Sequence, residues 1–161
     1  MLQWNWIDGE VLTIPASLVK NKREHKLFLS SFTKKQIDEL QQYASSDFFF
    51  PSKYSDSHQK NFTESHKRLS DKMKISPWTP RDIRRTCETQ MRTFIRDGEG
   101  VSRVLNHDIS AIRKHYDRGD YFERKTEVLT KWTEWLRGVI KDGDSNVVKL
   151  ATFRGRTKKE A

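Results

Sequence analysis

The chain has 161 residues, of which 31 are Lys or Arg and 22 are Asp or Glu, so its formal net charge is +9 at pH 7. This length and a hydrophobic fraction of 34% favour one folded domain with a moderate core over a disordered basic tail. The positive charge favours a polyanionic partner, with nucleic acid ahead of an acidic membrane surface.

Cysteine usage and hydropathy exclude several other classes. The lone cysteine, Cys87, excludes an intramolecular disulfide and a Cys-based zinc site. No segment approaches the roughly 18 consecutive apolar residues that a membrane span needs, and residues 1–11 have neither a basic leader nor an apolar signal core. We therefore expect a soluble intracellular protein with no membrane partner.

The first elements in the chain predict a small antiparallel sheet. Residues 4–15, WNWIDGEVLTIP, have the pattern of two short strands, because Asp-Gly between aromatic and β-branched runs is a strong hairpin signal. Residues 24–30 alternate polar and apolar side chains and predict a third strand, reached through a basic connection.

Helical periodicity begins after this third strand. Residues 33–44 predict a helix that Thr33 caps, with an apolar face formed by Ile37, Leu40 and Tyr43. Residues 48–52, FFFPS, predict a buried extended run that ends at proline, and residues 53–60 predict a loop. Residues 61–75 can form a basic amphipathic helix with Phe62, Leu69 and Met73 on one side.

The strongest helix signal lies in residues 78–95, WTPRDIRRTCETQMRTFI. Thr79 is a suitable N-cap, proline follows at the first helical position, and Asp82 lies three residues after Thr79, as in a capping box. The apolar stripe of this helix consists of Ile83, Cys87, Met91 and Phe94.

The last third of the chain predicts three more helices. Gly98 and Gly100 should break the preceding helix, and shorter helices should follow over about 101–106 and 109–117. A longer helix is expected over 121–141, with an apolar stripe of Val128, Leu129, Trp132, Trp135, Leu136, Val139 and Ile140. The fold class is therefore α+β: a mainly helical domain with a small three-stranded antiparallel sheet near the N-terminus.

Two arginines lie where a helix favours anions. Arg81 and Arg84 occupy the first turns of the capped helix, where unpaired backbone N–H groups and the helix dipole attract a phosphate. Helical geometry places Arg84 about 65° from the middle of the apolar stripe, so it should be half-buried, and Arg85 on the opposite, exposed side. An arginine bonded to backbone carbonyls or acidic side chains is the alternative to a ligand clamp.

Tyr116 and His107 also have two interpretations. Tyr116 shares a helix face with Ile109 and Ile112, which is the spacing of a core aromatic residue. His107 follows a helix end and could be part of a C-terminal cap.

Three segments, taken in chain order, favour the functional interpretation of these residues over the structural one. WTPRDIRRTCETQM, GVSRVLNHDIS and HYDRGDY closely resemble the signature series of tyrosine recombinases of the phage integrase type. In that family an H-x-L-R-R-T helix is followed by L-G-H and, nine residues later, by the nucleophilic tyrosine. The resemblance assigns Arg84 to the signature arginine, His107 to the histidine and Tyr116 to the nucleophile.

The resemblance extends over about residues 2–137. Residues 4–30 resemble the three-stranded sheet of the family, in which a hairpin lysine precedes an H-x-x-x-L-S strand, and FFFPS resembles its F-P-S run. Lys20 is the best match for the lysine, with Lys22 as the other possibility. Each motif alone is weak, whereas the ordered series is specific.

This sequence departs from the family pattern in two ways. Arg81 stands where the family commonly has histidine; it can donate to a phosphate, but its guanidinium stays protonated and is a poor base. The family's first catalytic arginine lies in a helix before the first strand, and this chain starts only a few residues before WNWID. We therefore expect residues 1–141 to be a catalytic domain without its N-terminal helices, from a longer integrase and poorly active on its own, followed by a basic, flexible tail at 142–161.

The resemblance implies site-specific DNA recombination that integrates or excises a phage or mobile element. Tyr116 would form a 3′-phosphotyrosine link, Arg84, His107 and Arg81 would stabilise the phosphate, and Lys20 would protonate the leaving 5′ oxygen. Neither ATP nor a metal cofactor is required. The implied partners are double-stranded DNA and other subunits of a synaptic tetramer, in the cytoplasm of a bacterial host, at the nucleoid. Further DNA contacts are expected from Lys22, Arg23, Arg85, Arg113 and Lys114.

Three other functions fit part of the pattern. A type IB topoisomerase uses similar chemistry for DNA strand passage. A non-catalytic DNA-binding module would use the same cations to contact phosphates and keep Tyr116 in its core. A basic protein-interaction domain is the third, and the complete motif order argues against it.

Overall fold

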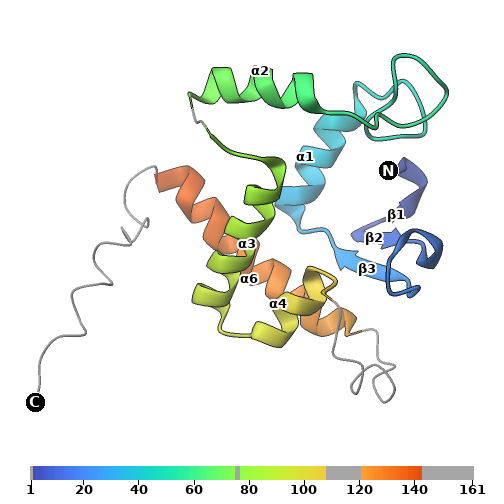
Figure 1. The fold of residues 1–161 in the computed structure, drawn as a ribbon. Helices are drawn as coiled ribbons and strands as arrows, with labels where there is room; N and C mark the ends of the chain where they lie inside the picture. Colours follow the sequence, from blue (N-terminus) through green and yellow to red (C-terminus); the bar gives the residue numbers. More distant parts are fainter. Residues whose placement is uncertain (1, 75–76, 108–120, 143–161) are drawn as a thin grey trace, which may run out of the picture.

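The computed structural model describes residues 2–74, 77–107 and 121–142. Within these residues the protein is α+β and mainly helical, with a three-stranded antiparallel sheet of order β1-β2-β3 near the N-terminus (Figure 1). The fold class expected from the sequence is confirmed. The helix expected at 109–117 and nearly all of the tail expected at 142–161 lie outside the described residues.

The sheet forms around a two-residue hairpin. β1 (Ile7–Asp8) pairs with β2 (Val11–Ile14), and β2 pairs with β3 (His25–Phe28). Gly9 at the turn has φ +56°, a conformation that glycine adopts without a steric penalty, so the Asp-Gly signal was read correctly. The first strand is shorter than predicted, because Trp4–Trp6 forms a 3-10 turn.

The aromatic run at 48–52 packs against this N-terminal turn. Trp4 stacks on Phe49 with ring centroids 4.0 Å apart, and Gln3 forms an isolated bridge with Phe48. Phe49 is buried, but Phe50 is 48% exposed. The prediction that this run is buried is therefore correct only for Phe49, whose ring stacks on Trp4.

Helix α1 (Ser31–Gln41) begins two residues earlier than predicted. The Ser30 hydroxyl accepts the backbone N–H of Thr33 at 3.2 Å, so Ser30 is the N-cap and the prediction of a Thr33 cap was wrong. The helix also ends before Tyr43, which is 84% exposed and does not extend the apolar face.

Helix α2 (Thr63–Met73) lies at the edge of the molecule, away from α4 (Figure 1). The predicted helix is present, but none of its residues is buried. Phe62, Leu69 and Met73, its apolar side, are 43 to 46% exposed.

Helices α3 (Pro80–Ile95), α4 (Gly98–Val104) and α6 (Phe122–Asp142) form the helical layer that carries the core. Met91, Val101, Val104 and Val128 are its buried residues, and Leu27 of β3 packs against them. The stripe predicted on α3 is buried only at Met91, and Ile83 and Phe94 are 55% and 41% exposed.

The glycines between α3 and α4 do not act as predicted. Helix α3 ends at Ile95, and its C-cap Arg96 is left-handed with φ +58°. Asp97 then caps α4, so Gly98 and Gly100 belong to α4 instead of breaking a helix. A Cβ on Gly100 would lie 2.8 Å from Val128 Cγ2. Gly100 is therefore needed for the close contact between α4 and α6.

Candidate active site

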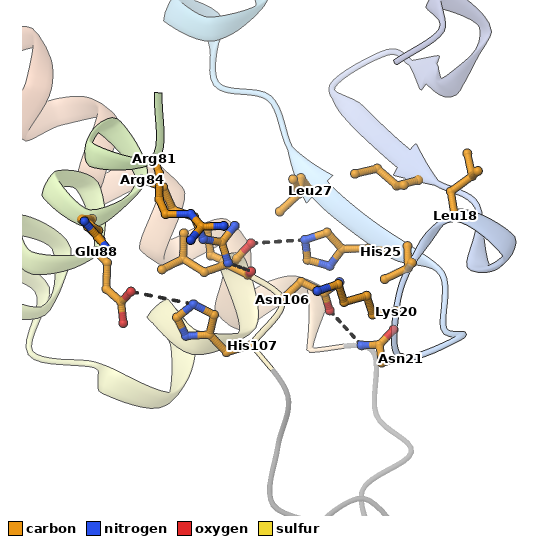
Figure 2. Close-up of a pocket in the computed structure, with 15 residues that line it drawn as sticks. Leu18, Lys20, Asn21, His25, Leu27, Arg81, Arg84, Glu88, Asn106 and His107 are labelled. Atoms are coloured by element: carbon orange, nitrogen blue, oxygen red, sulfur yellow. Dashed lines mark hydrogen bonds and ion pairs between the residues drawn. The ribbon is translucent and has the colours of Figure 1, made fainter. Parts of the chain in front are cut away.

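A cleft of about 800 Å³ lies between the β2–β3 connection, the first half of α3 and the C-terminal end of α4. Figure 2 shows Arg81, Arg84 and Glu88 on one side, Lys20, Asn21 and His25 on the other, and Asn106 and His107 between them. Five residues assigned from the sequence line this cleft: Lys20, Arg81, Arg84, Arg85 and His107. With Glu88 as the acidic residue among its lining, the cleft is predominantly cationic.

The start of α3 is fixed by its cap. The backbone N–H and the hydroxyl of Thr79 both donate to Asp82 Oδ2 at 2.8 Å, which confirms the predicted capping pair. These hydrogen bonds lower the pKa of the Asp82 carboxyl. Arg81 and Arg84 are three residues apart on this helix and so point to the same side of it.

Arg84 is exposed, so the prediction that it is half-buried was wrong. The apolar stripe beside it is itself uncovered at this end, because Ile83 is 55% exposed. One guanidinium nitrogen, Nη2, donates to the backbone carbonyl of Leu105 at the end of α4. The alternative of an arginine bonded to a carbonyl is therefore present in the structure.

Arg85 lies on the exposed side, as helical geometry predicted. Its side chain is 70% exposed and pairs with Asp82 at 3.1 Å. It reaches the rim of the cleft, although its guanidinium is already engaged by a carboxylate.

His107 is placed by the way α4 ends. Asn106 is left-handed with φ +53°, its N–H bonds to the Arg103 carbonyl, and the N–H of His107 bonds to the Ser102 carbonyl at 2.9 Å. This is the hydrogen-bond pattern of a Schellman cap, so the backbone of His107 does take part in a C-terminal cap. Its ring faces Glu88, with Nε2 3.7 Å from Oε2.

A hydrogen bond from Arg92 holds the Glu88 carboxylate in place beside the His107 ring. Its Oε1 accepts from Arg92 Nε at 3.0 Å, while the other Arg92 nitrogens donate to the Gly98 carbonyl and the Ser102 hydroxyl. Sequence reasoning did not single out Glu88, although its spacing of four from Arg84 and from Arg92 places all three on one helix face.

The structure separates the two candidate lysines. Lys20 lines the cleft, whereas Lys22, which is left-handed with φ +55°, and Arg23 are not among the lining residues. Tyr116, Arg113 and Lys114 lie outside the described residues, so their positions relative to the cleft stay predictions.

Two further residues of the cleft were not assigned a role from the sequence. His25 in β3 is buried, and its Nε2 lies 3.2 Å from the Val104 carbonyl. Asn21 donates from Nδ2 to Asn106 Oδ1 at 2.8 Å. A signal for His25 existed, because a histidine in a strand that packs against the core must find a polar partner when it is buried.

The comparisons give no independent assignment: no family model, no curated protein and no solved structure matches this chain. Among the helices of the described residues, none is both long and apolar enough to cross a membrane. In the same part of the chain, no three His, Cys, Asp or Glu side chains are grouped as metal ligands.

Proposed function

We propose that this protein acts in site-specific DNA recombination, cleaving and rejoining DNA through a phosphotyrosine at Tyr116. One observation carries the proposal: Lys20, Arg81, Arg84 and His107 come from three separate parts of the chain and line one cationic cleft. A phosphodiester is the ligand that such a group of donors suits best, since its non-bridging oxygens accept hydrogen bonds and carry the charge.

The proposed chemistry assigns one task to each group. The Tyr116 oxygen attacks phosphorus, and its proton passes to solvent. As the phosphorus to O5′ bond breaks, Lys20 gives a proton to the leaving O5′. Arg84, Arg81 and His107 donate to the non-bridging oxygens, on which negative charge grows during the attack. The covalent link conserves the energy of the bond, so a new 5′-hydroxyl can reverse the step and join another strand.

A covalent adduct tests this proposal directly. The chain is incubated with a pool of nicked duplexes of randomised sequence, in which release of a short fragment traps the enzyme on DNA. We expect a band that resists denaturant, that forms in the presence of a chelator and that is lost in Tyr116→Phe while DNA binding is kept. A band that persists in Tyr116→Phe would show that this tyrosine is not the nucleophile.

An activated substrate tests the role of Lys20. In a thymidine 3′-phosphate ester of p-nitrophenol, the leaving group departs without protonation and no target sequence is needed. Lys20→Met should reduce cleavage of ordinary DNA by about 100-fold or more but leave p-nitrophenolate release nearly unchanged. Lys22→Met, which removes the same charge outside the cleft, is the matched control: as an expected DNA contact it should affect DNA affinity only, and the cleavage rate at saturating concentrations of either substrate should stay nearly unchanged.

A non-catalytic DNA-binding module is the second candidate. The hydrogen bond from Arg84 to the Leu105 carbonyl favours it, because this arginine already has a structural partner. This candidate predicts salt-dependent DNA binding without an adduct on either the nicked duplex or the activated ester.

A further inference from the structure

The C-terminal turn of α4, residues 104–107, is held by side chains from three other elements. His25 of β3 contacts the Val104 carbonyl, Arg84 of α3 donates to the Leu105 carbonyl, and Asn21 of the β2–β3 connection donates to the Asn106 side chain (Figure 2). The last carbonyls of a helix have no partner within the helix, so they need hydrogen-bond donors from elsewhere, as His25 and Arg84 provide here.

His25 is the buried member of this set. Its side chain is 8% exposed and reaches 79 residues along the chain to Val104. A carbonyl can only accept, so Nε2 of His25 carries the hydrogen and, in the neutral ring, Nδ1 does not. Burial and the positive charges of Lys125 and Arg84 lower the pKa of His25, which favours this neutral form.

We propose that His25 is a positioning residue: through the Val104 carbonyl it fixes the C-terminal turn of α4 and thereby the place of the His107 ring in the cleft. The turn is short, and His107 is three residues after the carbonyl that His25 binds. Between them lies Asn106, which is left-handed, and a hydrogen bond from the Asn21 side chain holds its side chain in place. This inference rests on the proposed function only for its effect on DNA cleavage.

Amide hydrogen exchange tests the structural half without any assumption about activity. The N–H groups of Asn106 and His107 close the cap, so their exchange should accelerate when the turn loosens. We expect at least a tenfold increase at both amides in His25→Leu, relative to the amide of Val101 in the middle of α4, which bonds to the Asp97 carbonyl. His25→Gln, whose amide nitrogen can still donate to the Val104 carbonyl, should restore protection.

Two further variants separate this effect from general destabilisation. Asn106→Gly keeps the left-handed conformation but removes the partner of Asn21, so it should loosen the same turn without disturbing the buried histidine. Arg124→Met is the matched control, since Arg124 binds Asp97 and Glu99 at the opposite end of α4. It should raise exchange at Val101 without a selective increase at His107.

Adduct formation tests the functional half. His25→Leu should slow covalent adduct formation 10- to 100-fold, because a displacement near 1 Å in a catalytic group has effects of that order, while the Kd for DNA changes less than threefold. His25→Gln should recover most of the rate. If wild type forms no adduct, the proposed function fails and exchange alone decides whether His25 fixes the turn.

The proposal is overturned by any of three results. These are unchanged exchange at Asn106 and His107 in His25→Leu, a His25→Gln variant that behaves like His25→Leu, or a normal rate of adduct formation despite faster exchange.

Discussion

Substituting Gly100 by alanine should destabilise the protein, although helix propensity predicts the reverse. Alanine in a helix interior is favoured over glycine by about 1 kcal/mol. A Cβ at this position, however, would lie 2.3 Å from Asp97 Oδ2 and 2.8 Å from Val128 Cγ2. Val128 is 1% exposed, and Asp97 is held by two hydrogen bonds from Arg124 at 2.7 and 2.8 Å, so neither neighbour can move freely.

The magnitude follows from these contacts. Overpacking of this kind costs about 1 to 3 kcal/mol, and displacing Asp97 weakens the cap that accepts the Gly100 N–H at 2.9 Å, worth about 1 kcal/mol. Against a propensity gain of about 1 kcal/mol, the net loss should be about 1 to 3 kcal/mol, or roughly 3 to 9 °C in Tm for a chain of this size.

Thermal and urea unfolding of Gly100→Ala measure this effect, with Gly98→Ala as the matched control. A Cβ on Gly98 meets only Arg92 Nη1, at 3.1 Å, which is the end of a flexible side chain. Gly98→Ala should therefore be neutral or slightly stabilising. A Gly100→Ala protein as stable as wild type would refute the close packing of α4 against α6.

Four further predictions concern electrostatics. Arg124→Met should lower the free energy of unfolding by about 1 kcal/mol at pH 7, once solvent screening is allowed for, whereas the exposed Arg85→Met should change it by less than about 0.5 kcal/mol. Hydrogen bonding to Arg124 lowers the pKa of Asp97 from 3.8 to about 2, so urea titrations should show this stabilisation above pH 3.8 and its loss as the pH falls toward 2. Because the pKa of His25 is lowered from 6.5, the unfolded chain binds more protons below that pH; stability should fall with acidification, by at most about 1.4 kcal/mol per pH unit, and His25→Gln should flatten this slope. DNA affinity should fall by about 100-fold or more between 50 and 200 mM salt, and affinity that barely moves would refute phosphate-based binding.

Local signals in the sequence predicted the elements whose formation depends on neighbouring residues. The Asp-Gly hairpin, the Thr79 and Asp82 cap and the long final helix, displaced by one residue, all follow from turn chemistry or helical periodicity. The family resemblance made Lys20 the better match and left Lys22 open, and of the two only Lys20 lines the cleft.

The errors arose where tertiary contacts decide the outcome. Periodicity placed Arg84 beside an apolar stripe, but it could not show that this end of α3 stays exposed among the described residues. The low helix propensity of glycine predicted that Gly100 breaks a helix, whereas in the structure the missing Cβ leaves space for the side chain of Val128. Similarly, nothing local in the sequence indicates that His25 meets a carbonyl 79 residues away.

The two interpretations of Arg84 are compatible with each other. A guanidinium has five N–H donors in a fixed plane. Within the described residues, the hydrogen bond to the Leu105 carbonyl engages only the Nη2 atom of Arg84. That bond holds the plane of the group at the cleft before any ligand arrives. A donor fixed in this way loses less conformational freedom on binding a phosphate and needs no reorganisation as charge develops. In the proposed function, the contact that gives Arg84 a structural role would thus also prepare it to bind a phosphate.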